Sequence, residues 1–247
     1  MATVLSGTSG ALYYKPAGTK STFKAANVTN ASNNINVGTY LNFQVDDKVT
    51  FGTGTGGTLP AGLSASTPVF IRTYAAATGI ATFAATAGGT ELALTDDGTD
   101  GTTPFTIDFS EFQSVGDCRE WSFEVTREEL DTTTIGGTLA QNAPFRTFIT
   151  GFADGSGSAT VYFTDDDTTI ASRLIEDVIQ RKQAGATFKL YMDTVLSSGT
   201  PDDTKSRSIE LEAVLTSASF SVTPDDAQTV SVNFRPTSAP TFDFTKS

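Results

Sequence analysis

Histidine is absent from this chain of 247 residues, which also has only one cysteine, one tryptophan and two methionines. The lack of histidine excludes Ser-His-Asp and Cys-His catalytic sites and removes the most common zinc ligand. The single cysteine, Cys118, excludes an intrachain disulfide and a metal site built from cysteines. No convergent set of acid, base and nucleophile remains. We therefore expect a protein that is not an enzyme and that has no catalytic residues, cofactor or metal.

Basic residues are also scarce, since 16 Lys and Arg stand against 28 Asp and Glu and give a net charge of -12. A protein that holds nucleic acid by neutralising its phosphates needs the opposite balance. No apolar run is long enough to cross a bilayer, and residues 1–7 lack the basic and apolar regions of a secretory signal. We expect synthesis and folding in a cytoplasm, with no membrane partner.

Short alternating patterns indicate a mostly β chain, and a hydrophobic share of 38% is enough for a substantial core. In residues 120–127, Trp121, Phe123 and Val125 fall on one face and polar residues on the other, and residues 158–163 alternate likewise. About thirty residues join these two strands, a length that is uncommon inside compact domains and usually belongs to a functional surface. This stretch displays the apolar residues Leu130, Ile135, Leu139, Phe145, Phe148 and Phe152. A lone domain has little reason to expose them, so we expect another molecule to cover them.

Residues 20–107 have a different texture, dominated by Ala, Thr and Gly, with short strand patterns between Gly- and Asp-rich turns. A small β sandwich or barrel inserted into the chain is predicted here. Its expected strands are residues 40–45, 48–51, 68–74, 80–83, 91–94 and 105–109. One more short strand is expected before it, at residues 11–14.

One helix is predicted, over residues 168–184, with acids before it and Gly185 as its stop. Its apolar stripe should lie across a sheet, while charged residues such as Arg173 and Asp177 fall mostly elsewhere. The stripe consists of Ile170, Leu174 and Val178, flanked by Ile175 and Ile179. Strands at residues 187–193 and 208–215 should follow, and then a tight hairpin that pairs residues 217–222 with residues 229–234.

Several motifs that suggest binding sites are better explained by turns and caps. Residues 52–57 match the spacing of a dinucleotide fingerprint, but Pro60 follows where a helix should begin. The Asp-rich residues 96–101 lack the EF-hand pattern, and the three acids at 165–167 suit helix capping. Glu128 and Glu129 are neighbours in an extended strand, so they point to opposite faces and form no acid/base pair.

The central hairpin and everything after it resemble the tail tube proteins of long-tailed bacteriophages, which stack as rings to make the hollow shaft of the tail. The resembling order begins with WSFEVTREELDTTTIG at residues 121–136 and FRTFITGFADGSG at residues 145–157, followed by the second strand and the acidic helix entry. Residues 187–192, 220–234 and 240–242 are similar to the end of these proteins. The resemblance covers residues 1–17 and, more closely, residues 108–244.

The resemblance implies an all-β fold with one flanking α-helix, a sandwich or barrel of the tail-tube type that carries a small inserted β domain. Residues 1–19 and 108–247 would form the tube domain, and residues 20–107 the insertion, on the outside of the tube. Six copies would form a ring, and the rings would stack into a conduit for DNA in the virion tail, assembled in the host cytoplasm. Besides further copies of itself, the implied partners are a tape measure protein in the lumen and terminator or baseplate proteins at the tube ends.

The resemblance also assigns the long connection as the loop that contacts a neighbouring subunit or ring. The residues carried over are Glu128, Glu129, Leu130, Asp131, Thr132, Thr133, Thr134, Ile135, Leu139, Phe145, Arg146 and Phe148. Two other readings of the sequence stay open. One is the inner tube of a contractile injection system, which has nearly the same physical demands. The other is a carbohydrate- or surface-binding β module that uses Tyr40, Phe70 and Tyr74.

Overall fold

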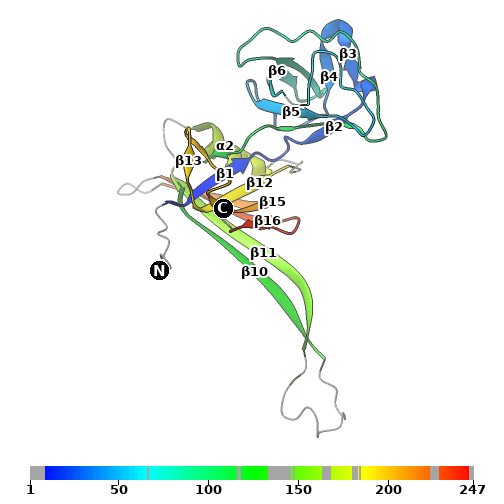
Figure 1. Cartoon of the computed structure of the whole chain (residues 1–247). Helices are drawn as coiled ribbons and strands as arrows, with labels where there is room; N and C mark the ends of the chain where they lie inside the picture. Colours follow the sequence, from blue (N-terminus) through cyan, green and yellow to red (C-terminus); the bar gives the residue numbers. More distant parts are fainter. Residues whose placement is uncertain are drawn as a thin grey trace.

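The protein consists of a main body, an upper domain and a long arm (Figure 1). The computed structural model describes residues 9–65, 67–115, 118–132, 146, 148–162, 168–179, 183, 185–222 and 228–244, and it leaves the side chains of residues 168–172 undescribed. Most of the described chain is β-strand with a single α-helix, so the expectation of an all-β fold with one flanking helix is confirmed.

The main body is built on an eight-stranded antiparallel sheet. Its strands are β1 (Ala11–Lys15), β9 (Gln113–Ser114), β10 (Cys118–Asp131), β11 (Phe148–Tyr162), β12 (Thr187–Asp193), β15 (Arg207–Ser221), β16 (Thr229–Pro236) and β17 (Thr241–Asp243). The order across the sheet is β10-β11-β16-β15-β12-β1-β9, with β17 beside β15. A separate small hairpin joins β12 to β15 and consists of β13 (Leu196–Ser197) and β14 (Thr200–Pro201).

Strand β15 joins two halves of this sheet, one that contains β12, β1 and β9 and one that contains β16, β11 and β10. Its first part pairs with β12 up to Glu212, and its later part pairs with β16 from Ala213 onward. The expected strands at residues 208–215 and 217–222 are therefore one strand with an irregularity between Leu215 and Ser217. The two halves share one core, in which the rings of Phe188 and Phe234 stack with centroids 4.3 Å apart. The turn expected between β15 and β16 lies outside the described residues.

Helix α2 (Thr168–Ile179) packs against β15 and β16. The predicted stripe is partly right: Leu174 is fully buried, and Ile175 and Val178 pack against the core, but Ile179 is exposed. Arg173 and Asp177 lie beside this stripe and are nevertheless buried, since their exposed fractions are 1% and 0%. They lie four residues apart on one helix face, and that face meets the upper domain.

The upper domain is a second antiparallel sheet, of seven strands in the order β2-β8-β5-β6-β7-β4-β3. Its strands are β2 (Ser21–Phe23), β3 (Val28–Thr29), β4 (Asn34–Asn36), β5 (Lys48–Gly52), β6 (Val69–Ala75), β7 (Ile80–Ala84) and β8 (Phe105–Phe109). Two short 3-10 helices, η2 (Ala25–Asn27) and η3 (Asn30–Ser32), lie beside β3. The domain has its own core, with a T-shaped contact between Phe51 and Phe83 at a centroid distance of 5.0 Å.

Two of the expected strands in this domain do not form. In residues 40–45, Leu41 and Phe43 are buried as the pattern predicts, but the backbone makes no ladder and Tyr40 has a positive φ of 54°. In residues 91–94, a single bridge from Ala84 to Glu91 is the only strand-like pairing. At these places the alternating apolar pattern therefore indicates buried side chains and does not indicate paired strands.

Candidate assembly surfaces

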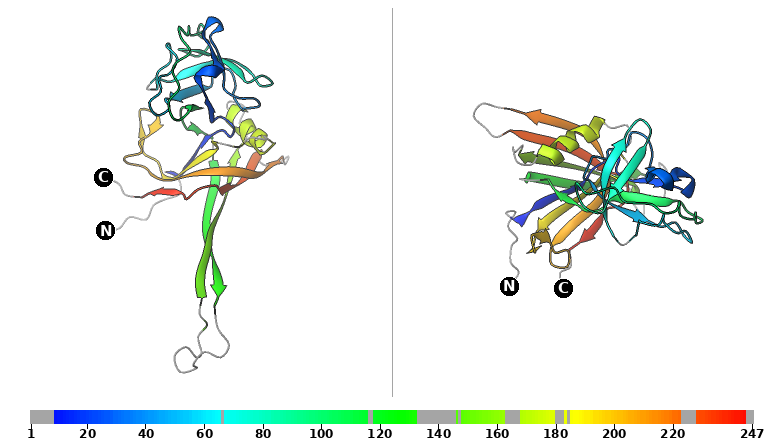
Figure 2. Two further views of the ribbon diagram at one scale, coloured as in Figure 1. Left: turned by 90° about the vertical axis from the view of Figure 1, so that its right-hand side faces the viewer. Right: turned by 90° about the horizontal axis from the view of Figure 1, so that it is seen from above.

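The arm is the distal part of β10 and β11, from Val125 to Asp131 and from Phe148 to Gly155. The two strands stay paired from Trp121 opposite Ala159 to Asp131 opposite Phe148. Figures 1 and 2 show that they leave the main body on the side opposite to the upper domain. The expectation of a loop from residue 128 to residue 148 is therefore wrong for its ends, which continue both strands. Asp and, to a lesser degree, Glu disfavour strands only weakly, and continuous pairing outweighs that preference.

A β-bulge interrupts the arm. Arg127 pairs with Ala153 and Glu129 with Thr150, so Gly151 and Phe152 together face Glu128. The bulge turns the Phe152 side chain into solvent, where it is 90% exposed. It is the most exposed of the large apolar side chains in the described part of the chain.

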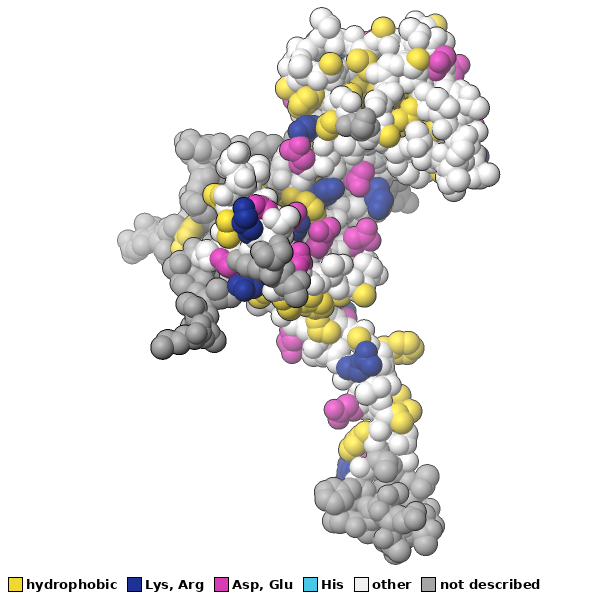
Figure 3. Space-filling view, in the orientation of Figure 1, with side chains coloured by type: hydrophobic (Ala, Val, Ile, Leu, Met, Phe, Trp, Pro, Cys, Tyr) yellow, Lys and Arg dark blue, Asp and Glu magenta, His cyan; other side chains and the backbone are white. Residues whose placement is uncertain are grey.

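Other apolar side chains are also exposed along the arm (Figure 3). They are Val125, Leu130, Phe148 and Ile149. Leu130 and Ile149 are directly opposite each other in the ladder, so they share one face of the ribbon. A two-stranded ribbon alone in water is marginally stable, and this one leaves apolar groups uncovered. The arm therefore has the character of an interaction element.

The structure places the described members of the predicted contact set on this arm or next to its end. They are Glu128, Glu129, Leu130, Asp131, Thr132, Arg146 and Phe148, with Arg146 Nη1 3.7 Å from Asp131 Oδ2. The remaining members lie outside the described residues and are Thr133, Thr134, Ile135, Leu139 and Phe145. Val125, Ile149 and Phe152 were not in the predicted set. Phe152 is among the apolar residues of the connection that the sequence predicts to be covered by another molecule, but the bulge that exposes its side chain has no signal in the sequence.

A hydroxyl-rich surface covers the outer face of the strands β10, β11, β16 and β15. We call it the hydroxyl face, and it consists of Ser122, Thr126, Ser156, Ser158, Thr160, Ser217, Ser219, Ser221, Thr229, Ser231 and Asn233. These side chains alternate with the core residues of the same strands. Several bond across the ladder: the hydroxyls of Ser122 and Ser158 lie 2.8 Å apart, and the Asn233 side-chain amide donates to Ser217 at 2.8 Å.

Charges on the hydroxyl face are mostly negative. Glu120 and Glu124 in β10 and Asp154 in β11 alternate onto it. Among the described ladder positions of this face, the basic residue is Arg235. The guanidinium of Arg235 lies 3.7 Å from Asp154. A phosphate backbone would meet hydroxyl groups and acids here with little basic charge to hold it.

On the face of β11 opposite to the hydroxyl face, two glycines make room for side chains of β16. A Cβ on Gly157 would lie 2.3 Å from Cε2 of Phe234, and one on Gly155 would lie 2.9 Å from Cγ of Pro236. Only glycine lets these side chains of β16 lie across β11. Beyond them is an open apolar groove of about 440 Å³, which we call the arm-root groove. Its lining comprises Phe123, Val125, Ala153, Asp154, Gly155, Phe242 and the β16–β17 connection through Pro236 and Pro240.

The junction between helix α2 and the upper domain is polar and buried. Arg173 Nη2 lies 2.7 Å from Oδ2 of Asp47, and the guanidinium carbon is 5.8 Å from the Phe109 ring centroid. Burial raises the pKa of Asp47, and the contact with Arg173 opposes that shift. Burial removes the hydration of both charged groups, so each group depends on the other to offset that cost.

Asp177 accepts hydrogen bonds from three donors in two other segments of the chain. Its Oδ2 accepts hydrogen bonds from the Tyr14 hydroxyl and from Ala17 N–H at 2.8 Å, and its Oδ1 accepts one from the Asn42 amide. Burial raises the pKa of Asp177 to about 6 although these donors and Arg173 oppose the shift. At neutral pH the group is therefore ionised and matched to three donors. Arg173, Asp177 and their partners join the helix, β1 and the upper domain.

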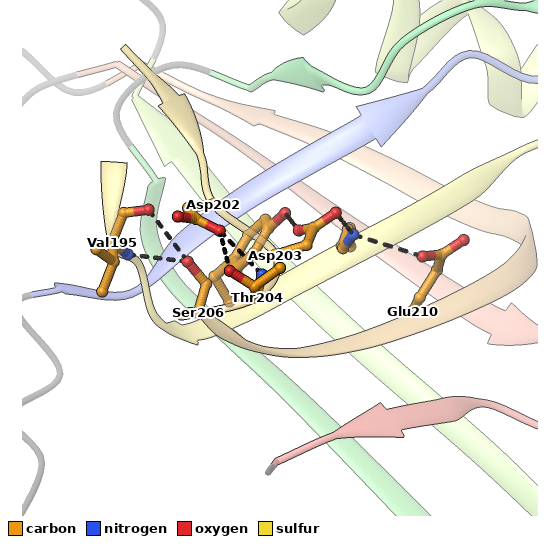
Figure 4. A network of polar contacts seen from close by, with 8 residues as sticks. Val195, Asp202, Asp203, Thr204, Ser206 and Glu210 are labelled. Atoms are coloured by element: carbon orange, nitrogen blue, oxygen red, sulfur yellow. Dashed lines mark hydrogen bonds and ion pairs between the residues drawn. The ribbon is translucent and has the colours of Figure 1, made fainter. Parts of the chain in front are cut away.

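A second polar network fixes the hairpin β13–β14 to β12 (Figure 4). Lys189 Nζ lies 2.7 Å from Asp203 and 3.7 Å from Glu210, and the Tyr191 hydroxyl donates to Asp203 at 2.7 Å. Against the effect of partial burial, these hydrogen bonds lower the pKa of Asp203. Val195 and Ser206 close the other end through a hydrogen bond of 2.9 Å. Every contact in this network is internal, so it serves the fold.

The acids at residues 96–101 also serve the fold. Asp96 accepts from the N–H groups of Ala61 and Gly98, and Asp100 accepts from Ala25 N–H. Within the described ranges, no three His, Cys, Asp or Glu residues gather as a metal site. No helix in those ranges is long and apolar enough to cross a membrane.

The three aromatic residues that suggested a carbohydrate site have different roles. The Tyr74 hydroxyl donates to Gly38 O and accepts from Leu41 N–H, both at 2.8 Å, so it holds the turn that carries Tyr40. Tyr40 is exposed, whereas Tyr74 packs against the domain core and Phe70 is half-buried. They do not form one exposed aromatic surface.

Comparisons with known proteins give structural similarity only. No family model matches the chain, and no curated protein matches it. Among solved structures, a chain from the virion of a native gene transfer agent particle is similar over 53% of this chain and 88% of its own, with 16% identity and a TM-score of 0.37. A chain from the tail of an empty gene transfer agent particle, computed with C6 symmetry, is similar over 54% and 87%, with 15% identity and a TM-score of 0.38.

Proposed function

We propose that this protein is a structural subunit of a phage-type tail, the major tail tube protein, which assembles into stacked rings around a DNA conduit. The observation that carries the proposal is the four-stranded unit β10-β11-β16-β15, with one face closed by the core and α2 and the other face open and hydroxyl-rich. The resemblance seen in the sequence leads to the same function.

The two borders of this unit favour a ring. Among the described strands, β10 has a neighbour only on its β11 side, and the part of β15 beyond Ala213 has one only on its β16 side. Uncovered sheet edges are a hazard in a monomer and become bonding surfaces when copies join edge to edge. The four strands alternate in direction, so β10 of one copy would run antiparallel to β15 of the next. A closed barrel of six copies would leave no edge open.

The placement of the other parts supports a proposal for which side of the ring wall faces the lumen and which faces outward. The hydroxyl face with Glu120, Glu124 and Asp154 would line the lumen, where its scarcity of basic groups lets DNA pass without stalling. Helix α2 and the upper domain lie on the core side of the same strands, so the upper domain would decorate the outside of the tube. The arm would reach a subunit of the neighbouring ring through its exposed apolar side chains.

In this function the protein has no catalytic site and no cofactor. It would be located in the virion tail, with a tape measure protein in the lumen during assembly and terminator or baseplate proteins at the ends. The inner tube of a contractile system makes the same physical demands. A surrounding sheath in micrographs of the native particle would favour that alternative.

Electron microscopy of the purified protein at high concentration tests assembly, and we expect stacked rings. A strictly monomeric species would contradict the proposal. The lumen assignment has a separate test, in which Ser156→Cys and, as the control, Ala77→Cys are each introduced into a Cys118→Ala background. Assembly should protect position 156 from a bulky maleimide and leave position 77 on the upper domain reactive. Equal labelling of both positions in long tubes would contradict the lumen assignment.

A further inference from the structure

We infer that the arm-root groove is the receptor for the arm of a second copy of this chain, which inserts the side chains around the bulge at Phe152. This inference rests on the proposed tail tube function and adds to it the surface that receives the arm. The lining of this groove is apolar apart from Asp154, Thr237 and Ser238.

The groove lies where the core of the main body opens toward the arm. Phe123 at its inner end packs against the core, whereas Val125 and Phe242 are about half exposed, at 53% and 49%. Phe242 contacts Phe244, which is also exposed, with ring centroids 5.4 Å apart. Helix α2 closes the core on the side of the upper domain, and the described residues include no comparable cover at the groove.

The arm of the same molecule cannot fill this groove. Its strands are continuous with the groove floor through Phe123 and Val125, and they remain paired while they run away from the body (Figure 1). Reaching back would break the pairs from Arg127 to Asp131. The uncovered groove and the uncovered arm therefore need two molecules to cover each other.

One chain thus carries two different apolar surfaces that are both exposed, and contact between unlike surfaces of identical copies is heterologous. Such a contact repeats without closing on itself between two copies, which suits the stacking of rings.

The groove size suits the occupant. A volume of about 440 Å³ admits large side chains such as Phe152 together with part of the Leu130–Ile149 pair. Its scarce polar groups fit an apolar ribbon better than a glycan or a nucleic acid, both of which need several hydrogen-bond partners. The occupant is therefore the arm of another copy.

Disulfide trapping tests the contact in assembled protein. The variant combines Phe152→Cys on the arm with Ser238→Cys at the groove in a Cys118→Ala background, and the control replaces Ser238→Cys by Ala77→Cys. We expect oxidation of the first variant to give a ladder of covalent multimers under denaturing conditions. The control and the single-cysteine variants should give no ladder.

The outcomes separate this inference from the proposed function. Tubes that form without a 152–238 ladder, or with one only in the Ala77→Cys control, would overturn the groove as the receptor and leave the tube function intact. Failure of the wild-type protein to form tubes would contradict the tube function itself.

A charge placed in the groove gives an independent readout. Ala239→Asp is in the exposed β16–β17 connection, so the fold should tolerate it. Burying this charge under a docked arm should raise the protein concentration needed for assembly about tenfold or more. The matched control Ala77→Asp makes the same change on the upper domain and should assemble like the wild type. Equal assembly of both variants would overturn the inference.

Discussion

The α2 junction and the arm invert the usual distribution of polar and apolar groups. At the junction, an arginine, two carboxyl groups, a tyrosine and an asparagine are buried between two well-packed bodies. On the arm, phenylalanine, isoleucine and leucine side chains are exposed to water. Every charge at the junction has a partner inside the chain, whereas the apolar groups of the arm have no cover within the described residues.

The difference separates the contacts that the isolated chain completes from those that, in the proposed function, another copy would complete. A buried charge without a partner is strongly destabilising, so the ion pair and hydrogen bonds of the junction must form as the chain folds. The arm differs, because its two strands stay paired while its apolar side chains are exposed, and these side chains remain available for binding. Four measurements can break or sharpen this contrast, and they are ordered from the largest expected change in stability to the smallest.

Arg173→Ala should have the largest effect, because it leaves Asp47 buried without its cationic partner. We expect a loss of about 3–5 kcal/mol in the free energy of unfolding, measured by urea denaturation. The control is Arg235→Ala, which breaks the exposed pair with Asp154 and should cost less than about 1 kcal/mol. Equal losses in the two variants would show that burial at the junction is not what matters.

The pH dependence of stability should reveal Asp177. Its folded pKa of about 6 is higher than its ordinary value of 3.8, so the folded chain binds the proton more tightly than the unfolded chain does. The contribution of Asp177 is therefore more favourable at pH 4 than at pH 7, by up to about 3 kcal/mol, and declines as the pH rises through that window. The measurement is the stability of the wild type minus that of Asp177→Asn at each pH. A difference that is constant between pH 4 and pH 7 would contradict this assignment.

Gly157→Ala tests the close approach at the base of the arm. The new Cβ would lie 2.3 Å from the Phe234 ring, so the ring must move out of its stack with Phe188. We expect a loss of about 1–3 kcal/mol, seen as a lower thermal midpoint. Ser156→Ala, one residue away on the hydroxyl face, should change stability by less than about 0.5 kcal/mol. Adding Phe234→Leu should recover part of the loss.

Phe152→Ser should have the smallest effect on stability, within about 0.5 kcal/mol, since the side chain is 90% exposed. Its effect should appear instead in assembly, measured as the yield of sedimenting tubes. The control is Tyr40→Ser, which removes another exposed aromatic residue from the upper domain and should leave the tube yield unchanged. A loss of stability in Phe152→Ser with a normal tube yield would reverse the contrast between junction and arm.

The sequence predicted the elements whose signal is local. The strand at residues 187–193 was predicted with the bounds that the structure has, and the strand at residues 11–14 to within one residue. Alternation was misleading where apolar residues are buried without a ladder, as at Leu41 and Phe43. The extent of the arm was also missed, because its Thr- and acid-rich ends are held by cross-strand pairing that composition does not encode.

The role of Arg173 and Asp177 could not be read from the helix pattern alone. Charged residues away from the apolar stripe normally face solvent. Here a second domain covers that face, and its contribution comes from Asn42 and Asp47, more than a hundred residues earlier in the chain. The groove depends in the same way on a distant pairing, which sets Phe234 and Pro236 opposite two glycines.

The even number of strands in the unit β10-β11-β16-β15 has a consequence for the width of a conduit. Because each copy presents edges that run in opposite directions, the same hydrogen-bonded seam can join it to the next copy in a ring of any size. Backbone pairing alone therefore does not determine how many copies form a ring. In the proposed tube, the tilt and curvature of the strands would therefore set the width of the channel, and core substitutions that alter sheet curvature would widen or narrow it while every seam stays intact.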